Sequence, residues 1–412
     1  MEYYFSATVL FLLLHLLLSS PTTIFYTQTP TLLSPITKEP NTLQYTLTIH
    51  TINDSPTPVI LLLDLGFAFT WLANCNTHHP LRHVPCNTPL CASLHSITCM
   101  NNNTCGLFAE NPVTRTATPG PAVIDSIILR TTDGRNVGPL FTVVDFVLSC
   151  AGPSLLKGLA EGVVGLAGLG STSNYGTTTF ALCLSGSPSA PGVAFFNSVG
   201  PYIFQPNDID LSTSLNYVPL LVNPVGGSTV ITYHNRPSDE YYVKLTSIRV
   251  NGKPVPLDPS LLQLTKLSTT TPYTTMESSI YKAFVQSFVA ESSATMNLTA
   301  IESVRPFKAC YDEDDVDATR VGWAVPTVDF VMGDVFWRVF GGNSMVRAGD
   351  GKLCLAFVDG GRDAREGMVI GGFQMEDNML EFDLGRGRLG FSSTLLLKGT
   401  TCSNFNFTTV GV

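Results

Sequence analysis

One aspartate in the first half of this 412-residue chain has the setting of a catalytic carboxylate. Asp64 follows the apolar run 59–63 and precedes Leu65-Gly66. An apolar run that ends in a polar residue and glycine indicates a strand that delivers its last side chain to a loop. Hydrolysis at such a site needs a second carboxylate, because two carboxylates that share one proton can act as base and acid toward a water molecule.

The Asp64-Leu65-Gly66 loop resembles the first catalytic loop of the pepsin-like aspartic proteases, and this resemblance implies a second carboxylate in the other half of the chain, where a serine stands instead. The segment that carries this serine reads Leu267-Ser268-Thr269-Thr270. A hydroxyl cannot replace a carboxylate in a proton-sharing pair. The sequence therefore predicts a chain without this chemistry, in which Asp64 and Ser268 are vestigial. Two interpretations of Asp64 remain: it organises its loop by accepting backbone N–H bonds, or it retains residual catalysis.

A similar apolar segment follows each loop. Residues 162–166 read Gly-Val-Val-Gly-Leu, and residues 368–372 read Met-Val-Ile-Gly-Gly. Apolar β-formers that run into glycine predict a strand passing close to another backbone. This repeat resembles the pepsin-like aspartic proteases, in which such a strand threads between the arms of each catalytic loop. The resemblance implies an all-β, two-lobed pepsin-like architecture with few short helices, with lobes over residues 30–210 and 213–412.

Local patterns predict several elements. Thr274-x-x-Glu277 is a capping box, and apolar residues recur at helical spacing from Ile280 to Val289. We expect a helix there whose aromatic stripe packs into the core. Asn251-Gly252 predicts a type I′ hairpin turn, and the preceding change of strand phase predicts a bulge. The triplet 383–385 repeats Asp-Leu-Gly, but it comes too late in the chain for a catalytic loop and predicts a hairpin turn.

Composition limits the possible functions. Only 13% of the residues are charged, 44% are hydrophobic, and the net charge is −9. The hydrophobic content argues against disorder, and frequent Thr, Ser, Pro and Gly favour short strands and turns. The acidic balance argues against nonspecific binding to nucleic acid or to an acidic membrane surface. Neither a G-x-S-x-G nucleophile motif nor a phosphate-binding P-loop is present, and no cofactor is indicated.

The N-terminus predicts export from the cell. Residues 9–18 are apolar except for His15, and Ser19-Ser20-Pro21 follows. This run suits a signal peptide over residues 1–22 and is too short to span a bilayer easily. The first residues contain Glu2 and no Lys or Arg, so a membrane anchor remains the alternative. We expect a secreted protein of the extracellular space and cell wall.

The cysteines fit an oxidising compartment. The ten are Cys75, Cys86, Cys91, Cys99, Cys105, Cys150, Cys183, Cys310, Cys354 and Cys402. An even number behind an export signal predicts five disulfides and no free thiol, with the pairing left open. Several histidines lie among Cys75 to Cys105, which raises the alternative of a zinc site; no C-x-x-C pair or paired histidine spacing supports it.

Four Asn-x-Ser/Thr sequons agree with secretion, since N-glycosylation occurs on exported chains. They begin at Asn53, Asn102, Asn297 and Asn406. Pro56 makes the first the weakest candidate. Asn102 lies in a run of three asparagines, which predicts an exposed loop.

Strings along nearly the whole chain narrow the resemblance. The matching segments are residues 102–106, 110–113, 154–156, 162–170, 182–186, 343–346, 358–361, 375–378 and the tail Thr401-Cys402-Ser403-Asn404-Phe405-Asn406-Phe407. In these the chain resembles the plant aspartic-protease-like extracellular glycoproteins: xyloglucanase and xylanase inhibitors, dermal glycoprotein and basic 7S globulin. The resemblance implies a secreted, catalytically inactive protein that inhibits microbial glycoside hydrolases in plant defence.

The same resemblance points to two inhibitory residues. Arg320, in Ala318-Thr319-Arg320-Val321-Gly322, matches a family arginine. Lys398 lies close to where xyloglucanase inhibitors carry an arginine and cereal xylanase inhibitors a histidine, so endoglucanase targets are favoured. A cation there could pair with the two carboxylates of a glycosidase cleft. The alternatives are ordinary solvated charges, a storage or signalling role as in 7S globulins, and an active or weakly active endopeptidase.

Overall fold

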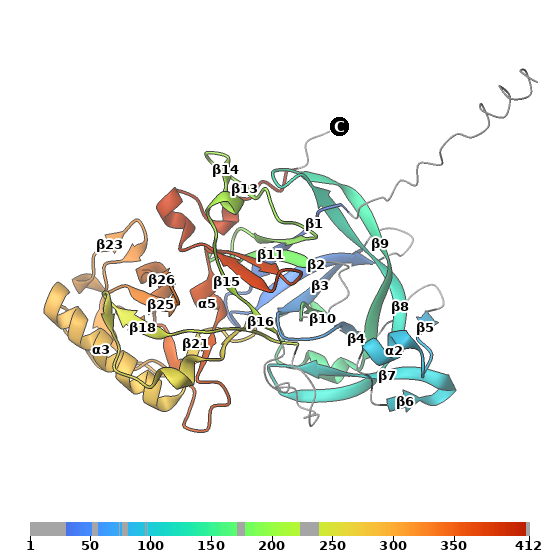
Figure 1. Cartoon of the computed structure of the whole chain (residues 1–412), viewed down its shortest axis with the longest axis horizontal. Helices are drawn as coiled ribbons and strands as arrows, with labels where there is room; N and C mark the ends of the chain where they lie inside the picture. The colour runs from blue at the N-terminus through green and yellow to red at the C-terminus, as the bar shows by residue number, and fades with distance from the viewer. Residues whose placement is uncertain are drawn as a thin grey trace, which may run out of the picture. The chain divides into compact units, whose positions relative to one another are not determined.

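The computed structural model describes residues 30–51, 57–73, 75, 81–94, 96, 98–170, 178–222 and 239–408. The predicted signal peptide and Asn53 lie outside these residues. Within them the chain is built mainly of strands (Figure 1). No helix among them is long and apolar enough to cross a membrane.

The largest sheet has 15 strands and draws on both halves of the chain. Its strands are β1 (Leu32–Lys38), β2 (Tyr45–Thr51), β3 (Thr57–Asp64), β4 (Thr70–Ala73), β5 (Arg82–His83), β6 (Thr98–Met100), β7 (Thr104–Asn111), β8 (Thr116–Thr132), β9 (Val137–Ala151), β10 (Val163–Gly168), β11 (Thr179–Cys183), β12 (Gly192–Phe196), β15 (Asn216–Pro219), β31 (Met379–Asp383) and β32 (Arg388–Phe391). Strand β31 pairs with β11, so the C-terminal end of the chain extends the sheet of the first half.

The second half forms smaller sheets. The six-stranded sheet contains β16 (Leu221–Val222), β17 (Tyr241–Val243), β20 (Thr265–Leu267), β30 (Met368–Ile370), β21 (Thr274–Met276) and β29 (Phe357–Asp359). The others contain β18 (Ser247–Val250), β19 (Lys253–Pro254), β25 (Val328–Met332) and β26 (Val335–Val339); β22 (Cys310–Asp312), β27 (Met345–Arg347) and β28 (Lys352–Leu355); β23 (Ala318–Thr319) and β24 (Gly322–Trp323); and β13 (Ile203–Phe204) and β14 (Ile209–Asp210). The α-helices are α2 (Pro89–Ser93), α3 (Ser278–Met296), α4 (Gly341–Ser344) and α5 (Gly372–Met375).

Both halves repeat one three-strand arrangement, which confirms the pepsin-like fold. Strand β10 runs parallel to β3 and antiparallel to β4. In the same way, β30 runs parallel to β20 and antiparallel to β21. The loops that carry Asp64 and Ser268 leave β3 and β20 at equivalent points of this repeat.

The strand pairing corrects the alignment of the two apolar segments, in which Gly165 was expected to correspond to Gly371. Leu63 pairs with Ala167 and Asp64 with Gly168, so Gly168, three positions after Gly165, corresponds to Gly371. A methyl carbon on Gly168 would lie 2.4 Å from the carbonyl oxygen of Phe67. On Gly371 it would lie 2.7 Å from the carbonyl oxygen of Thr271. Each strand therefore passes between the arms of its loop only because glycine stands there.

The predicted helix forms, but it begins later than the capping box indicated. Residues 274–276 form strand β21, whose pairing with β29 and β30 claims the residues of the expected cap. Glu277 is itself the N-cap, and its carboxylate accepts the N–H of Ser279 at 2.7 Å. The aromatic stripe packs as expected, since Phe284 and Phe288 are fully buried in the core.

The two predicted turns are present, whereas the bulge is not. Asn251 and Gly252 have φ values of 51° and 79°, as a type I′ turn requires. The phase change before them marks the point at which the chain leaves one sheet at β17 and enters another at β18. Asp383 pairs with Arg388 at the end of the β31–β32 hairpin, which confirms the turn there.

The ten cysteines form five disulfides, and none is free. The pairs are Cys75–Cys150, Cys86–Cys99, Cys91–Cys105, Cys183–Cys402 and Cys310–Cys354. This confirms the disulfide prediction over the zinc alternative, because the thiols that would bind metal are consumed. Among the residues that the structure describes, no group of three or more His, Cys, Asp or Glu side chains could hold a metal ion.

Candidate functional site

Asp64 is buried at the end of β3, with 7% of its surface exposed. Its Oδ1 accepts the N–H of Gly66 at 2.8 Å, and its carbonyl oxygen accepts the N–H of Leu169 at 2.8 Å. Burial raises the pKa of Asp64 to about 6, against the lowering effects of the Gly66 bond and of Lys266. The carboxyl group can therefore hold or release a proton under mildly acidic conditions.

Ser268 is equally buried, but its loop uses the hydroxyl internally. Only 4% of Ser268 is exposed, and its N–H donates to the carbonyl oxygen of Ile370 at 3.0 Å. The Oγ atom accepts the N–H of Thr271 at 3.2 Å and the Thr271 hydroxyl at 3.0 Å, and it lies 3.3 Å from the Thr270 hydroxyl. The serine thus closes its own loop.

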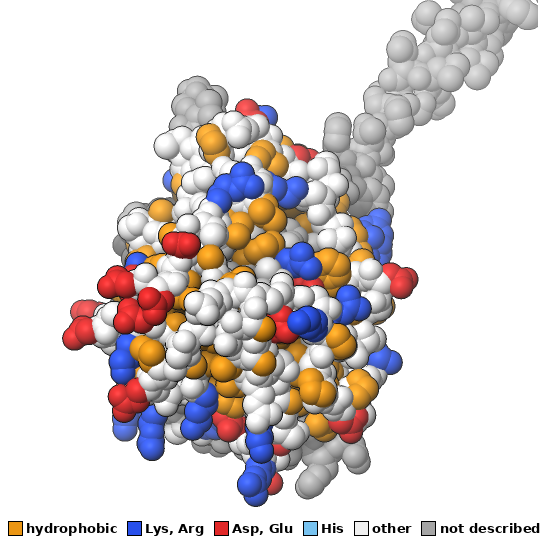
Figure 2. Space-filling model, turned by 90° about the vertical axis from the view of Figure 1, so that its left-hand side faces the viewer, with side chains coloured by type: hydrophobic (Ala, Val, Ile, Leu, Met, Phe, Trp, Pro, Cys, Tyr) orange, Lys and Arg blue, Asp and Glu red, His pale blue; other side chains and the backbone are white. Residues whose placement is uncertain are grey.

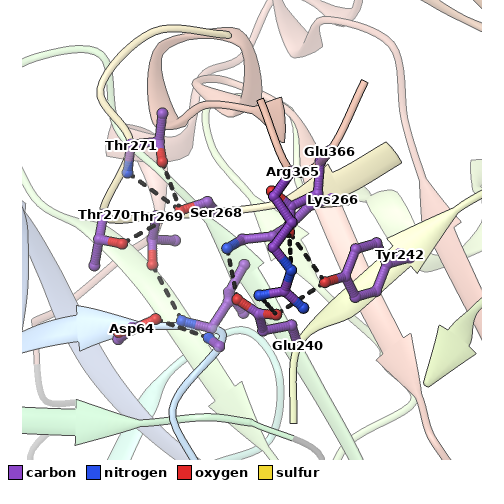
Figure 3. A network of polar contacts seen from close by, with 12 residues as sticks. Asp64, Glu240, Tyr242, Lys266, Ser268, Thr269, Thr270, Thr271, Arg365 and Glu366 are labelled. Atoms are coloured by element: carbon purple, nitrogen blue, oxygen red, sulfur yellow. Dashed lines mark hydrogen bonds and ion pairs between the residues drawn. The ribbon is translucent and has the colours of Figure 1, made fainter. Parts of the chain in front are cut away.

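Thr269 joins the two loops, as Figure 3 shows. Its hydroxyl donates to the carbonyl oxygen of Leu63 at 2.7 Å and accepts the N–H of Leu65 at 3.2 Å. Leu65 is the equivalent residue of the first loop, and it has no hydroxyl with which to reciprocate. The structure therefore brings the Asp64 and Ser268 segments together, as the sequence predicted, through a one-sided contact.

A charge cluster around the buried Glu240 flanks the Asp64 loop on the side drawn at the right in Figure 3. Glu240 is 4% exposed and pairs with Lys266 at 2.6 Å, while the Tyr242 hydroxyl donates to Glu240 at 2.8 Å. Arg365 lies 4.0 Å from the Glu240 carboxylate and 3.6 Å from that of Glu366. The Glu240 carboxylate is thus already paired with Lys266 and lies within 4.0 Å of Arg365.

Glu240 presses directly on the first loop. A methyl carbon on Gly66 would lie 3.1 Å from Cγ of Glu240 and 3.5 Å from Oδ1 of Asp64. The sequence prediction missed this cluster. The available signal was Lys266 between the buried residues Thr265 and Leu267, since a charged residue in a buried strand requires a partner.

The hairpin beside the first loop is pinned at its turn. Strands β7 and β8 meet at Asn111, whose amide donates to the carbonyl oxygens of Leu155 and Lys157 at 2.6 and 2.9 Å. The Trp71 indole N–H donates to the carbonyl oxygen of Glu110 at 2.9 Å.

The predicted inhibitory residues lie on separate exposed loops of the second half. Arg320 is exposed in the turn between β23 and β24. Lys398 is exposed at the end of a 3-10 turn, η6 (Leu395–Lys398), beside Leu397, of which 46% is exposed. Within the residues that the structure describes, neither cation has an ion-pair partner.

Figure 2 shows the face of the molecule that lies at the left of Figure 1, where β23 and α3 are labelled. Acidic, basic and apolar side chains are interspersed over it. A partner approaching this face would therefore meet individual charges more than one broad field of a single sign.

Three of the predicted glycosylation sites are described. Asn102 and Asn297 are exposed, and both have positive φ values, of 61° and 56°. Asn406 is half-buried, and its side-chain oxygen accepts the N–H of Thr408 at 3.0 Å. Glycosylation at these positions remains a prediction.

Comparison with known proteins assigns the family. A family model described as the xylanase inhibitor N-terminal domain matches residues 45–198, and one described as the xylanase inhibitor C-terminal domain matches residues 240–393. A protein named as a probable aspartic proteinase from Glycine max is 46% identical, over 92% of this chain and 94% of its own length. This chain belongs to the xylanase-inhibitor family of aspartic-protease-like proteins. Within the family's two matched regions, Asp64 falls in the first and Ser268 in the second.

Solved structures of the family agree with the fold. The crystal structure of edgp matches with a TM-score of 0.87 and 42% identity, covering 92% of this chain and 99% of the other. The structure of conglutin gamma, a basic 7S globulin from lupine seeds, matches with a TM-score of 0.78 and 31% identity, covering 92% and 99%. The family thus includes both inhibitor-like and seed-globulin members, as the resemblance implied.

Proposed function

We propose that this protein is a secreted inhibitor of microbial cell-wall-degrading glycoside hydrolases and has no protease activity of its own. The observation that carries the proposal is Arg320, exposed and without an ion-pair partner among the described residues, on a xylanase-inhibitor-family scaffold that carries Ser268 opposite Asp64. Five disulfides suit the oxidising extracellular space. The cell wall is the compartment in which such a protein would meet its target.

The absence of proteolysis follows from the two loops. Ser268 stands at the topological equivalent of Asp64 and supplies no second carboxylate. The neighbouring Glu240 is neutralised by Lys266 at 2.6 Å, so it cannot replace the missing acid as a proton-sharing partner. One carboxyl group alone cannot act as acid and base toward the same water molecule.

Inhibition would use positive side chains of this protein against the carboxylates of the target enzyme. A glycoside hydrolase holds two carboxylates in an open cleft. The guanidinium of Arg320 is exposed at a hairpin tip and could pair with them in the forked geometry that arginine favours. Lys398 would add a second, less directional positive charge. Endoglucanases that cleave xyloglucan are the preferred target class.

The direct test is residual activity of a panel of fungal glycoside hydrolases incubated with the secreted protein, followed by inhibition constants for variants. Removing one partner of a buried charge pair costs about 2–5 kcal/mol. Arg320→Ala should therefore weaken inhibition roughly 30-fold to several-thousand-fold. Arg320→Lys should recover part of the loss, and Lys398→Ala should cost less.

Arg362→Ala is the matched control, because Arg362 is also an exposed arginine on a loop of the second half. Its inhibition constant should equal that of the wild type. Equal inhibition by wild type, Arg320→Ala and Lys398→Ala would show that loop insertion is wrong. A wild type that blocks no hydrolase in the panel would remove the inhibitor proposal itself.

A seed-globulin-type storage or signalling role is the second candidate. It is favoured by the 31% identity to a structure described as a basic 7S globulin from lupine seeds. The acidic balance of this chain, with a sequence pI near 5.2, sets it apart from a basic globulin. Accumulation of the protein in seeds, together with failure to inhibit hydrolases, would favour this role.

A further inference from the structure

Arg347 clamps the base of the hairpin that carries Arg320. It is the last residue of β27, and its Nε donates to Oε1 of Glu313 at 2.7 Å. The carbon of the same guanidinium lies 5.0 Å from the centre of the Trp323 ring. Glu313 precedes the hairpin in the short 3-10 turn η5 (Glu313–Asp315), and Trp323 ends its second strand. One side chain therefore touches both ends of segment 313–323.

The rest of the hairpin is already held closely. The N–H of Ala324 donates to the carbonyl oxygen of Asp317 at 2.8 Å, which closes the base. The Thr319 hydroxyl donates to the carbonyl oxygen of Gly322 at 2.6 Å. A methyl carbon on Gly322 would lie 2.0 Å from the N atom of Gly342, so the hairpin rests directly on α4. The guanidinium of Arg347 adds a side-chain contact between this unit and η5.

We infer that Arg347 is a positioning residue for the Arg320 contact: it holds the hairpin in its binding conformation before a partner arrives. This inference rests on the inhibitory role proposed above for Arg320. A loop that is already ordered loses less conformational freedom on binding, so its affinity is higher for the same contacts. Arginine suits this position because its planar fork can bond a carboxylate while its face lies over an aromatic ring.

Loss of the Arg347 contacts should lower the affinity for a partner and change the free energy of unfolding little. The Arg347 side chain is 66% exposed, and ion pairs between exposed groups contribute little to folding. The other two tryptophans, Trp71 and Trp337, are 0% and 1% exposed. Half-buried Trp323 is therefore the tryptophan that a soluble quencher reaches most readily, and it reports the clamp without any partner.

The first measurement is acrylamide quenching of tryptophan fluorescence in the complete secreted protein. Arg347→Ala should raise the quenching constant with an unchanged thermal midpoint, because the guanidinium no longer covers the Trp323 ring. Arg347→Lys should give an intermediate value, since lysine keeps the charge and lacks the planar face. Arg362→Ala should quench as the wild type does. Wild-type quenching in Arg347→Ala would overturn the clamp, whatever the outcome of inhibition assays.

The second measurement is a double-mutant cycle against a hydrolase that the wild type blocks. Arg347→Ala alone should weaken inhibition roughly 3- to 10-fold, the effect of ordering about one side chain less before binding. In the Arg320→Ala background it should cause no further loss, because a residue that acts through Arg320 has nothing left to position. An equal further loss in that background would show that Arg347 contacts the partner directly and would overturn the positioning role. If no hydrolase is blocked, the proposed function fails, and the quenching result still decides whether the clamp exists.

Discussion

The Asp64 and Ser268 loops leave equivalent strands and are crossed by equivalent glycines, and each polar side chain accepts a backbone N–H of its own loop, yet one is a carboxylate and the other a hydroxyl. Asp64 has one carboxylate bond within its loop, to Gly66, and burial raises its pKa to about 6. The Ser268 hydroxyl is taken up by Thr271 of its own loop. The comparison shows that two loops with different side chains can share one backbone geometry, because packing and the glycine crossings hold both loops.

The largest effect is expected from a second carboxylate in the Ser268 loop. Ser268→Asp would place a second carboxylate in a site of which 4% is exposed. An uncompensated buried charge costs about 3–5 kcal/mol, so urea unfolding at neutral pH should show a loss of that order. The loss should shrink as the pH falls toward about 4, where the pair can share a proton. Ser268→Ala, which adds no charge, is the control.

The same variant tests protease chemistry. Neither the wild type nor Ser268→Asp should cleave a denatured protein substrate well at acidic pH, because Glu240 and Lys266 crowd the first loop and the β7–β8 turn is pinned by Asn111. Acid cleavage that pepstatin blocks and that Asp64→Ala abolishes, in the wild-type protein, would show that the chain is an active protease after all.

A second variant addresses the contact between the loops. Thr269→Val keeps the side-chain shape and removes the hydroxyl that serves Leu63 and Leu65. Two buried groups lose a partner at about 1–3 kcal/mol each, so we expect a loss of about 2–6 kcal/mol in the free energy of unfolding. Thr270→Val, in the adjacent position, should cost clearly less. Equal effects of the two changes would mean that Thr269 does not join the halves.

The third test uses the pH dependence that Asp64 should impose. Its pKa is raised from 3.8 to about 6, so between these values the folded protein holds a proton that the unfolded chain has released. Ionisation of Asp64 therefore opposes folding, and stability should fall as the pH rises from about 4 to about 6, by at most about 3 kcal/mol.

Asp64→Asn should flatten that part of the stability curve, measured by urea unfolding at several pH values. Asp258→Asn, at an exposed aspartate whose pKa is lowered by the Ser260 N–H bond, should leave the slope unchanged. A wild-type slope in Asp64→Asn would place the titration elsewhere, with Glu376 and Asp377 the next groups to examine, because burial raises the pKa of both.

Much of the fold could be predicted because its signals are local. Asn251-Gly252 determines its turn through backbone conformation alone, and the apolar run that ends at Leu63 indicates a buried strand directly. The Thr274-x-x-Glu277 pattern predicted the start of the helix too early. Residues 274–276 instead form β21, because pairing with β29 and β30, far along the chain, outweighs the local helix signal. The glycine register was three positions off, since the segments containing Gly165 and Gly168 satisfy the same apolar pattern. The Glu240–Lys266 pair depends on a contact across 26 residues, and no local pattern announces its partner.

The pairing of β31 with β11, together with the Cys183–Cys402 disulfide, bears on how this molecule can be divided. The disulfide joins residues 219 positions apart. Both the disulfide and the strand pairing lie inside the compact unit Thr31–Val412. A first half produced alone would lack the neighbour of β11 and would expose that strand edge to pairing with other chains. The two halves therefore repeat one plan without being independent modules, because the β11–β31 pairing and the Cys183–Cys402 bond belong to both.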